Sequence, residues 1–320
     1  MFVIQHPHLT GDEGSIALTG DQLRKDLRNW LTPPDPSVNY NTATDARHEG
    51  TALWFIGCDA FKDWKVSNSL LWIYGKRTFS HPSASLWLMD LYFYSWFREE
   101  RPQVRHTSNS FCRDCSRSSS SSIIQDLDCV VDTGSAHVAY FFFDFKDTGK
   151  QDDHALLSSL LIQLSHQSAS LCDVLSACYS THQSGSRQPS DRVLTQCLQD
   201  MLGLSTQVPI YLVLDALDEC PNTTGIPSSR DKVLALVEKL VKLNLPNLHL
   251  CITSRPEIDI RNFLEPLTSN RISLHDQSGQ KKDITDYVNF VVYSDMNMQR
   301  WREEDKNVVV EVLSEKADGM

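Results

Sequence analysis

Hydrophobic and polar positions follow two different rhythms along this chain. From Ala136 onward, short runs that are apolar throughout alternate with segments whose apolar residues recur every three to four positions. The first pattern predicts buried strands, and the second predicts helices with one apolar face. The expected strands are 137–145, 209–214 and 248–253, and the expected helices are 152–167, 191–204, 230–243, 283–292 and 305–317. Apolar strands alternating with helices predict an α/β fold, a parallel sheet with helices on both faces.

The first part of the chain is less regular. Helical spacing of apolar residues occurs at 21–31 and 42–57, and the apolar run 69–74 predicts one more buried strand. Between residues 77 and 119 the aromatic residues follow no period, so we expect an atypical, disordered insertion there. We therefore expect three parts: N-terminal helices (1–50), an α/β core (51–262) and the start of a truncated helical domain (263–320).

Composition narrows the class of protein. The 320 residues, 41% of them hydrophobic, suffice for one large domain with an appendage or for two domains. A formal net charge of −11 disfavours nucleic acid and anionic membranes as partners, because both attract basic surfaces. No apolar run approaches the roughly 20 residues of a membrane-spanning helix. The first ten residues lack an apolar signal segment, so we interpret the nine cysteines as reduced thiols in a cytoplasmic protein.

The clearest chemical signal is the acidic end of the strand 209–214. Apolar residues lead to Asp215, and Asp218 and Glu219 follow three and four positions later. Ligands of open α/β sheets bind beyond the carboxyl ends of the strands, where a carboxylate can hold Mg²⁺ against nucleotide phosphates. Asp218 or Glu219 could then orient or activate an attacking water. The structural alternative is an acidic turn that caps a helix.

A second polar cluster ends the next expected strand, at Thr253, Ser254 and Arg255. It would lie beside Asp215 if the two strands are neighbours in the sheet. Arg255 could then sense a terminal phosphate, because a guanidinium group matches phosphate geometry. The alternative is an ion pair between Arg255 and a nearby acid such as Glu257.

These segments resemble a known family. IYLVLDALDEC followed by ITSRPEIDI is similar to the Walker B and sensor 1 segments of NACHT-type (STAND) signal-transduction ATPases. More narrowly, they resemble the nephrocystin 3-like N-terminal module of large fungal NACHT proteins. YFFFDFKD, LLSSLLIQL and HEGTALWFIGCDAFKDWKVSNSLLWIYGK extend the resemblance to about residues 41–76 and 120–320.

The resemblance implies a Rossmann-like P-loop sheet that binds ATP or GTP with Mg²⁺. It also implies a nucleotide-controlled switch that self-associates and binds protein partners. By resemblance, Asp215 is the magnesium ligand and Glu219 or Asp218 the catalytic acid. Arg255 is the nucleotide sensor, next to Thr253 and Ser254.

The phosphate-binding loop of this family is disrupted. Its motif, G-x-x-x-x-G-K-[ST], offers backbone N–H groups and a lysine to phosphate and a hydroxyl to Mg²⁺. Gly75 and Lys76 remain where that loop should lie, but Arg77 follows, and the helix expected directly after the loop begins at Ser120. The intervening segment 77–119 is either non-coding sequence retained in the gene, which transcript sequencing would test, or a tolerated insertion. Gly149-Lys150 follows the wrong strand and is interpreted as an ordinary loop.

Two functions remain in competition. The first is a NACHT-like signalling NTPase fragment that neither binds nor hydrolyses ATP, and the second is a non-catalytic pseudo-NTPase scaffold for protein interactions. A hydrolase that uses the three acids with a metal alone is disfavoured, because no histidine accompanies them. Cys112 and Cys115 have zinc-like spacing, but a structural zinc site needs four ligands, so we interpret them as unrelated thiols.

Overall fold

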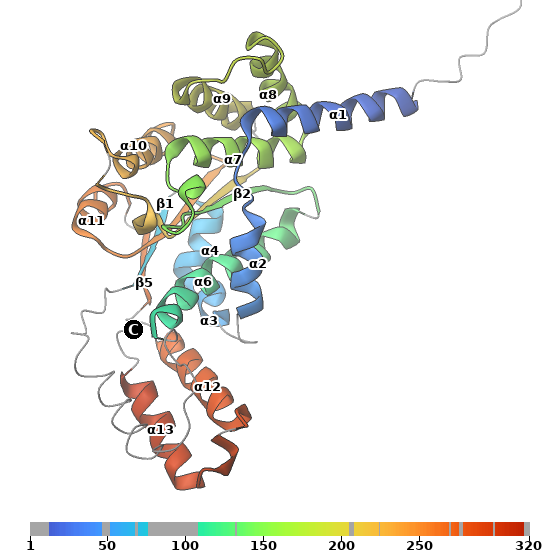
Figure 1. Ribbon diagram of the computed structural model, residues 1–320. Helices are drawn as coiled ribbons and strands as arrows, with labels where there is room; N and C mark the ends of the chain where they lie inside the picture. The colour runs from blue at the N-terminus through green and yellow to red at the C-terminus, as the bar shows by residue number, and fades with distance from the viewer. Residues whose placement is uncertain are drawn as a thin grey trace, which may run out of the picture.

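The computed structural model contains a five-stranded parallel sheet in the order β2-β3-β4-β1-β5 (Figure 1). The structure describes residues 13–46, 52–67, 70–75, 108–131, 133–204, 208–223, 225–268, 270–274, 278–296 and 298–316. The strands are β1 (Leu70–Tyr74), β2 (His137–Phe142), β3 (Ile210–Asp215), β4 (Leu248–Ser254) and β5 (Asn270–Ser273). The predicted α/β class, with a parallel sheet and surrounding helices, is therefore confirmed.

The central strands are apolar on both sides because helices cover both faces of the sheet. Every residue of β3 and of β4 is buried. The edge strand β5 was not predicted, since its sequence Asn-Arg-Ile-Ser buries only its last two residues. An edge strand pairs on one side only, so such a short polar segment can join the sheet where its neighbour β1 supplies the hydrogen-bond partners.

The first face of the sheet carries most of the helices. These are α1 (Glu13–Leu31), α7 (Asp153–Gln167), α8 (Ala169–Thr181), α9 (Asp191–Leu204), α10 (Ser229–Lys242) and α11 (Ile258–Leu264). Their apolar residues form one core with alternate residues of β1 to β4. Figure 1 shows α7 along this face, with α8, α9 and α1 outside it.

Of the described helices, four from the first part of the chain lie on the opposite face. They are α2 (Ser37–Ala46), α3 (Leu53–Gly57), α4 (Asp59–Val66) and α6 (Ser108–Val131). A second core forms here around Phe55, Phe61 and Trp64, which are fully buried. The Trp64 indole N–H donates to the Leu250 carbonyl of β4 at 3.1 Å, which satisfies its polar group inside this core.

The chain connections identify where a ligand crevice should lie. α6, the next described helix after β1, packs on one face, whereas the helices that follow β2, β3 and β4 pack on the other. Neighbouring strands β1 and β4 therefore send their connections to opposite faces. In open α/β sheets such a switch point marks the ligand crevice, outside the carboxyl ends of the two strands.

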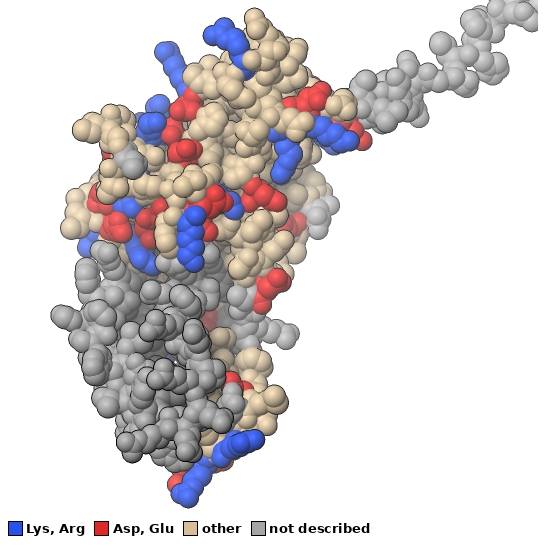
Figure 2. Space-filling view, viewed as in Figure 1, with Lys and Arg blue, Asp and Glu red and all other residues tan. Residues whose placement is uncertain are grey.

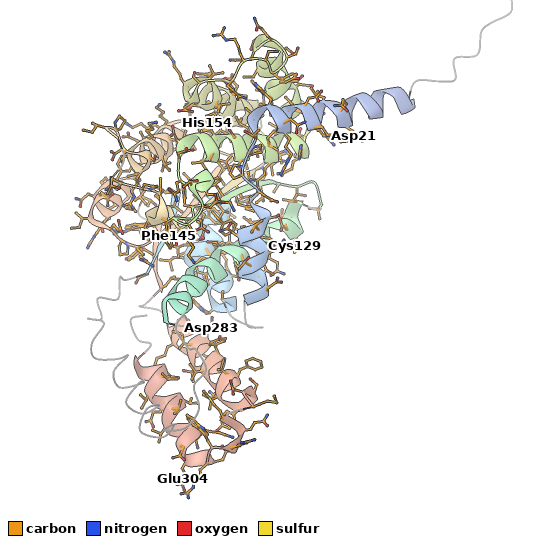
Figure 3. The ribbon with its side chains drawn as sticks, viewed as in Figure 1. Asp21, Cys129, Phe145, His154, Asp283 and Glu304 are labelled. Carbon is orange, nitrogen blue, oxygen red and sulfur yellow. The ribbon has the colours of Figure 1, made fainter. Side chains whose placement is uncertain are left out.

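Two C-terminal helices form a separate hairpin, drawn in red in Figure 1. They are α12 (Ser278–Ser294) and α13 (Glu303–Lys316), joined through η4 (Met298–Arg300) around Ile284, Val288 and Val292. Asp283, labelled in Figure 3, joins α12 to the helices on the opposite face of the sheet. Its carboxylate accepts hydrogen bonds from the Ala52 backbone N–H at 2.7 Å and from the Trp54 indole N–H at 3.0 Å.

Several helix boundaries differ from expectation. The helical pattern at 42–57 belongs to parts of α2 and α3, α8 and α11 were not predicted, and α6 begins at Ser108 instead of Ser120. The sequence at 108–119 has no apolar period, so its helical state comes from continuation of the helix that packs on the sheet from Ser120 onward. Residues 76–107, most of the predicted insertion, lie outside the described residues.

Candidate functional site

Asp215 ends β3 at the carboxyl edge of the sheet and is 1% exposed. Its Oδ1 accepts a hydrogen bond from the Thr253 hydroxyl of β4 at 2.5 Å and another from the Ser120 hydroxyl of α6. The Thr253 hydroxyl oxygen also accepts from the Ala216 backbone N–H at 3.0 Å. The carboxyl ends of β3 and β4 are therefore neighbours. On that condition we expected Thr253 to lie beside Asp215.

The acidic turn after β3 is held against the end of β4. Asp218 Oδ1 accepts a hydrogen bond from the Arg255 backbone N–H at 2.9 Å, and its Oδ2 lies 3.5 Å from Arg255 Nε. Asp218 is nearly buried, whereas the Arg255 side chain is 41% exposed. Glu219 accepts from the Phe145 backbone N–H at 3.2 Å. Both candidate catalytic acids thus make contacts that shape the loops, and Arg255 pairs with Asp218 rather than Glu257.

The remaining predicted residues flank the same edge. Ser254 accepts a hydrogen bond from the Trp72 indole N–H of β1 at 2.9 Å, which fixes the end of β4 against β1. Gly75 follows β1 and is half-buried, and Lys76 lies outside the described residues. Lys150 belongs to the turn η1 (Thr148–Lys150) after β2, where it is buried and donates to Asn39 of α2. The sequence interpretation of Gly149-Lys150 as an ordinary loop therefore agrees with these contacts.

Sequence reasoning missed Arg230, in the first turn of α10. Its guanidinium group donates to the Cys220 carbonyl at 2.9 Å and to the Asp218 carbonyl at 2.6 Å. It also pairs with Glu257 at 2.6 Å and with Asp259 at 3.0 Å. One buried cation thus joins the loop after β3 to the loop after β4. No local pattern announces this role, because its partners are 10 to 29 residues away in sequence.

Continuity of α6 decides what the site can hold. Ser120 is the 13th residue of this helix, which begins at Ser108. Backbone N–H groups inside a helix donate to carbonyls four residues earlier, and only those of the first turn are free. Twelve residues at about 1.5 Å each place that free end roughly 18 Å from Ser120 along the helix. α6 therefore does not present its N-terminus to Asp215.

These residues fit a nucleotide complex only in part. A carboxylate and a hydroxyl are ligands that Mg²⁺ accepts, so Asp215 and Ser120 suit the metal. Phosphates need free backbone N–H groups, and the described backbone beside Ser120 has them engaged in the helix. Within the described part of the chain, no group of three or more His, Cys, Asp and Glu residues is arranged to hold a metal ion. The side chains of Cys112 and Cys115 lie outside that part.

The surface gives further context. On the face shown in Figure 2, acidic and basic side chains are interspersed over the part of the molecule that contains the sheet. Phe145, labelled in Figure 3, follows β2 beside Glu219 and is 47% exposed. Among the helices that the structure describes, none combines the length and the apolar character needed to cross a membrane.

Comparison with known proteins supports the narrower part of the resemblance. A search of curated proteins gives no match. Residues 118–255 match the model of the family described as Nephrocystin 3, N-terminal. The matched segment begins two residues before Ser120 and ends at Arg255, so it contains Asp215 and the acidic turn but not Gly75. The chain is thus similar, from residue 118 within α6 to Arg255 just after β4, to the nephrocystin 3 N-terminal family.

Proposed function

We propose that this chain is a NACHT-type signal-transduction NTPase module whose phosphate site is closed, and that it neither binds nor hydrolyses ATP or GTP. The observation that carries the proposal is the continuous helix through Ser120, whose hydroxyl meets Asp215. The Ser120 hydroxyl and the Asp215 carboxylate lie side by side, as two ligands of one Mg²⁺ would. In a phosphate site, free backbone N–H groups would lie beside this pair. Here the neighbouring N–H groups belong to the interior of α6 and donate within the helix.

The magnitude of the loss follows from the missing contacts. A hydrogen bond to a charged group contributes about 1.5–3 kcal/mol, so losing three costs on the order of 5–9 kcal/mol. Micromolar binding corresponds to about 8 kcal/mol, and such a loss leaves affinity weaker than millimolar. We expect calorimetric titration with Mg-ATP or Mg-GTP to give no binding heat. Micromolar binding by the unaltered chain would refute the closed-site proposal.

A grafted phosphate-binding loop tests separately whether the fold belongs to the P-loop NTPase class. Residues 76–119 are replaced by a short G-x-x-x-x-G-K segment, so that Ser120 directly follows the new lysine. If β1, α6 and β3 keep the geometry of a P-loop NTPase, the grafted chain should bind Mg-ATP. Asp215→Asn in the graft should then weaken binding at least about tenfold, because the Mg²⁺ ligand is lost. A folded graft without binding would contradict the assignment to this class.

The second candidate function is a pseudo-NTPase scaffold, which the nucleotide experiments alone do not separate from an inactive NTPase module. A scaffold in the cytoplasm would self-associate or bind protein partners without nucleotide. Sedimentation of the unaltered chain, with and without Mg-ATP, distinguishes these outcomes. A concentration-dependent assembly that ignores nucleotide favours the scaffold, and a monomer at all concentrations counts against self-association.

A further inference from the structure

β2 forms one edge of the sheet, and its sequence lacks the residues that usually protect an edge. In the described part of the chain it pairs only with β3. The strand and the residue after it, HVAYFFF at 137–143, contain no Lys, Arg, Asp, Glu, Pro or Gly. Exposed edges usually carry charges or proline, because open backbone groups beside apolar, β-forming side chains pair readily with another chain. The outer side of β2 therefore needs another form of cover.

Two glutamine side chains of α7 bond to the backbone of β2 on this outer side. The Gln167 amide accepts a hydrogen bond from the Val138 N–H at 2.9 Å and donates to the Val138 carbonyl at 2.6 Å. The Gln163 amide does the same with Tyr140, at 3.0 Å and 2.8 Å. A side-chain amide offers a carbonyl oxygen and N–H donors, as a peptide group does. The two glutamines thus make the hydrogen bonds that a neighbouring strand would make to these two residues.

The spacing along α7 matches the spacing along β2. Gln163 and Gln167 are four residues apart, about 6 Å of helix rise, and their partners are two residues apart, about 6.6 Å of strand. Bonds within α7 also hold both amides, since Gln163 Nε2 donates to Ser159 Oγ at 3.0 Å and Gln167 Nε2 to the Gln163 carbonyl at 3.1 Å. The side chains are therefore fixed in the orientation that fits the edge of the sheet.

We propose that Gln163 and Gln167 occupy the place of an additional strand and prevent β2 from pairing with β2 of a second copy of this chain. A second copy is the matching partner because two identical edges can pair antiparallel about a two-fold axis, each exchanging N–H and C=O groups with the other. With the amides in place, the outward backbone groups of Val138 and Tyr140 are already bonded. This role does not depend on the nucleotide site.

Replacement of both glutamines by methionine tests the proposal. Gln163→Met with Gln167→Met keeps the length and the helix propensity of the side chains and removes both amides. The matched control is Gln22→Met with Gln196→Met. These glutamines also lie in helices, but each donates at 2.8 Å to an aspartate four residues later in its own helix. The control thus makes the same chemical change without touching β2.

Hydrogen exchange resolved to single amides gives the first readout. In the unaltered chain, the Val138 and Tyr140 amides should exchange at least about tenfold more slowly than unprotected amides. Both should lose this protection in the double variant at low protein concentration. The His137 and Phe143 amides donate at 2.9 Å and 3.0 Å to carbonyls at or next to the ends of β3. They should stay protected in every variant and so report that the sheet is intact.

Protein concentration supplies the second readout. As the double variant is concentrated, the Val138 and Tyr140 amides should regain protection, and sedimentation should show a dimer that neither the unaltered chain nor the control forms. Unprotected amides in the unaltered chain would overturn the proposal, as would protection that survives in the dilute double variant. A folded double variant that never dimerises would leave the glutamines only a structural role. If the double change unfolds the sheet, Gln163→Met alone, which frees only Tyr140, is judged by the same outcomes.

Discussion

Replacing the buried Arg230 by methionine should lower the free energy of unfolding several times as much as replacing an exposed cation does. The side chain is 6% exposed and holds two carboxylates and two backbone carbonyls around one guanidinium group. Arg230→Met keeps most of the apolar stem and removes all of these donors. Removing one partner of a buried ion pair typically costs about 3–5 kcal/mol, because the other charge stays behind without compensation.

The partial exposure of the two carboxylates lowers this expected loss of stability somewhat. The side chains of Glu257 and Asp259 are 28% and 33% exposed, so both carboxylates can regain water when the cation is gone. The carbonyls of Asp218 and Cys220 lose their donors in a more enclosed place. We therefore expect a loss of about 2–4 kcal/mol in the free energy of unfolding. Urea unfolding followed by circular dichroism and by tryptophan fluorescence measures it.

Lys242→Met is the matched control, because it also removes one positive charge. Lys242 is 67% exposed and pairs with Glu238 at 2.6 Å within α10. Exposed pairs of this kind contribute about 0.3–0.5 kcal/mol. A loss below about 1 kcal/mol for Arg230→Met, or one equal to that of Lys242→Met, would refute the idea that Arg230 joins the two loops.

Two further predictions concern the packing of α12 and the effect of acid. Gly279→Ala should loosen the C-terminal hairpin, because a Cβ there would lie 2.2 Å from Trp54 Cγ, and limited proteolysis should cut the variant faster. Gly20→Ala in α1 meets no atom within 4 Å and should instead stabilise its helix by up to about 1 kcal/mol. Burial lowers the pKa of three histidines, so unfolding takes up protons below pH 6.5 and stability should fall as the pH drops from 6.5 toward the lowered values. They are His137, His166 and His249. A urea midpoint that does not change between about pH 7.5 and 5.5, or rises in acid, would contradict this sign.

Sequence patterns predicted the parts of the fold whose signal is local. The strand that ends at Asp215 and the helix 191–204 carry unbroken apolar or periodic runs, and the structure has them within a residue of the expected bounds. The edge strand β5 lacks such a run and is set by its pairing with β1, so it was missed. The helix α8 was also not predicted, although Leu171, Val174, Leu175 and Cys178 recur at helical spacing.

The candidate site also has one part that the sequence predicted and one part that only the structure shows. The sequence alone placed three acids after one buried strand, and a polar strand end one α/β unit later, because both features are contiguous. Which acid meets which partner is a matter of distance in space. Asp218 with Arg255, Glu219 with the backbone of Phe145, and the contacts of Arg230 each join segments 10 or more residues apart.

Hydrophobic periodicity by itself determined that this chain builds a parallel sheet covered on both faces, because alternation of buried strands with amphipathic helices has few other solutions. That a phosphate-binding motif is interrupted between Lys76 and Ser120 is what the family resemblance implies, and it stays a prediction. Only the tertiary structure showed that α6 runs through Ser120 without a break and still brings its hydroxyl to Asp215.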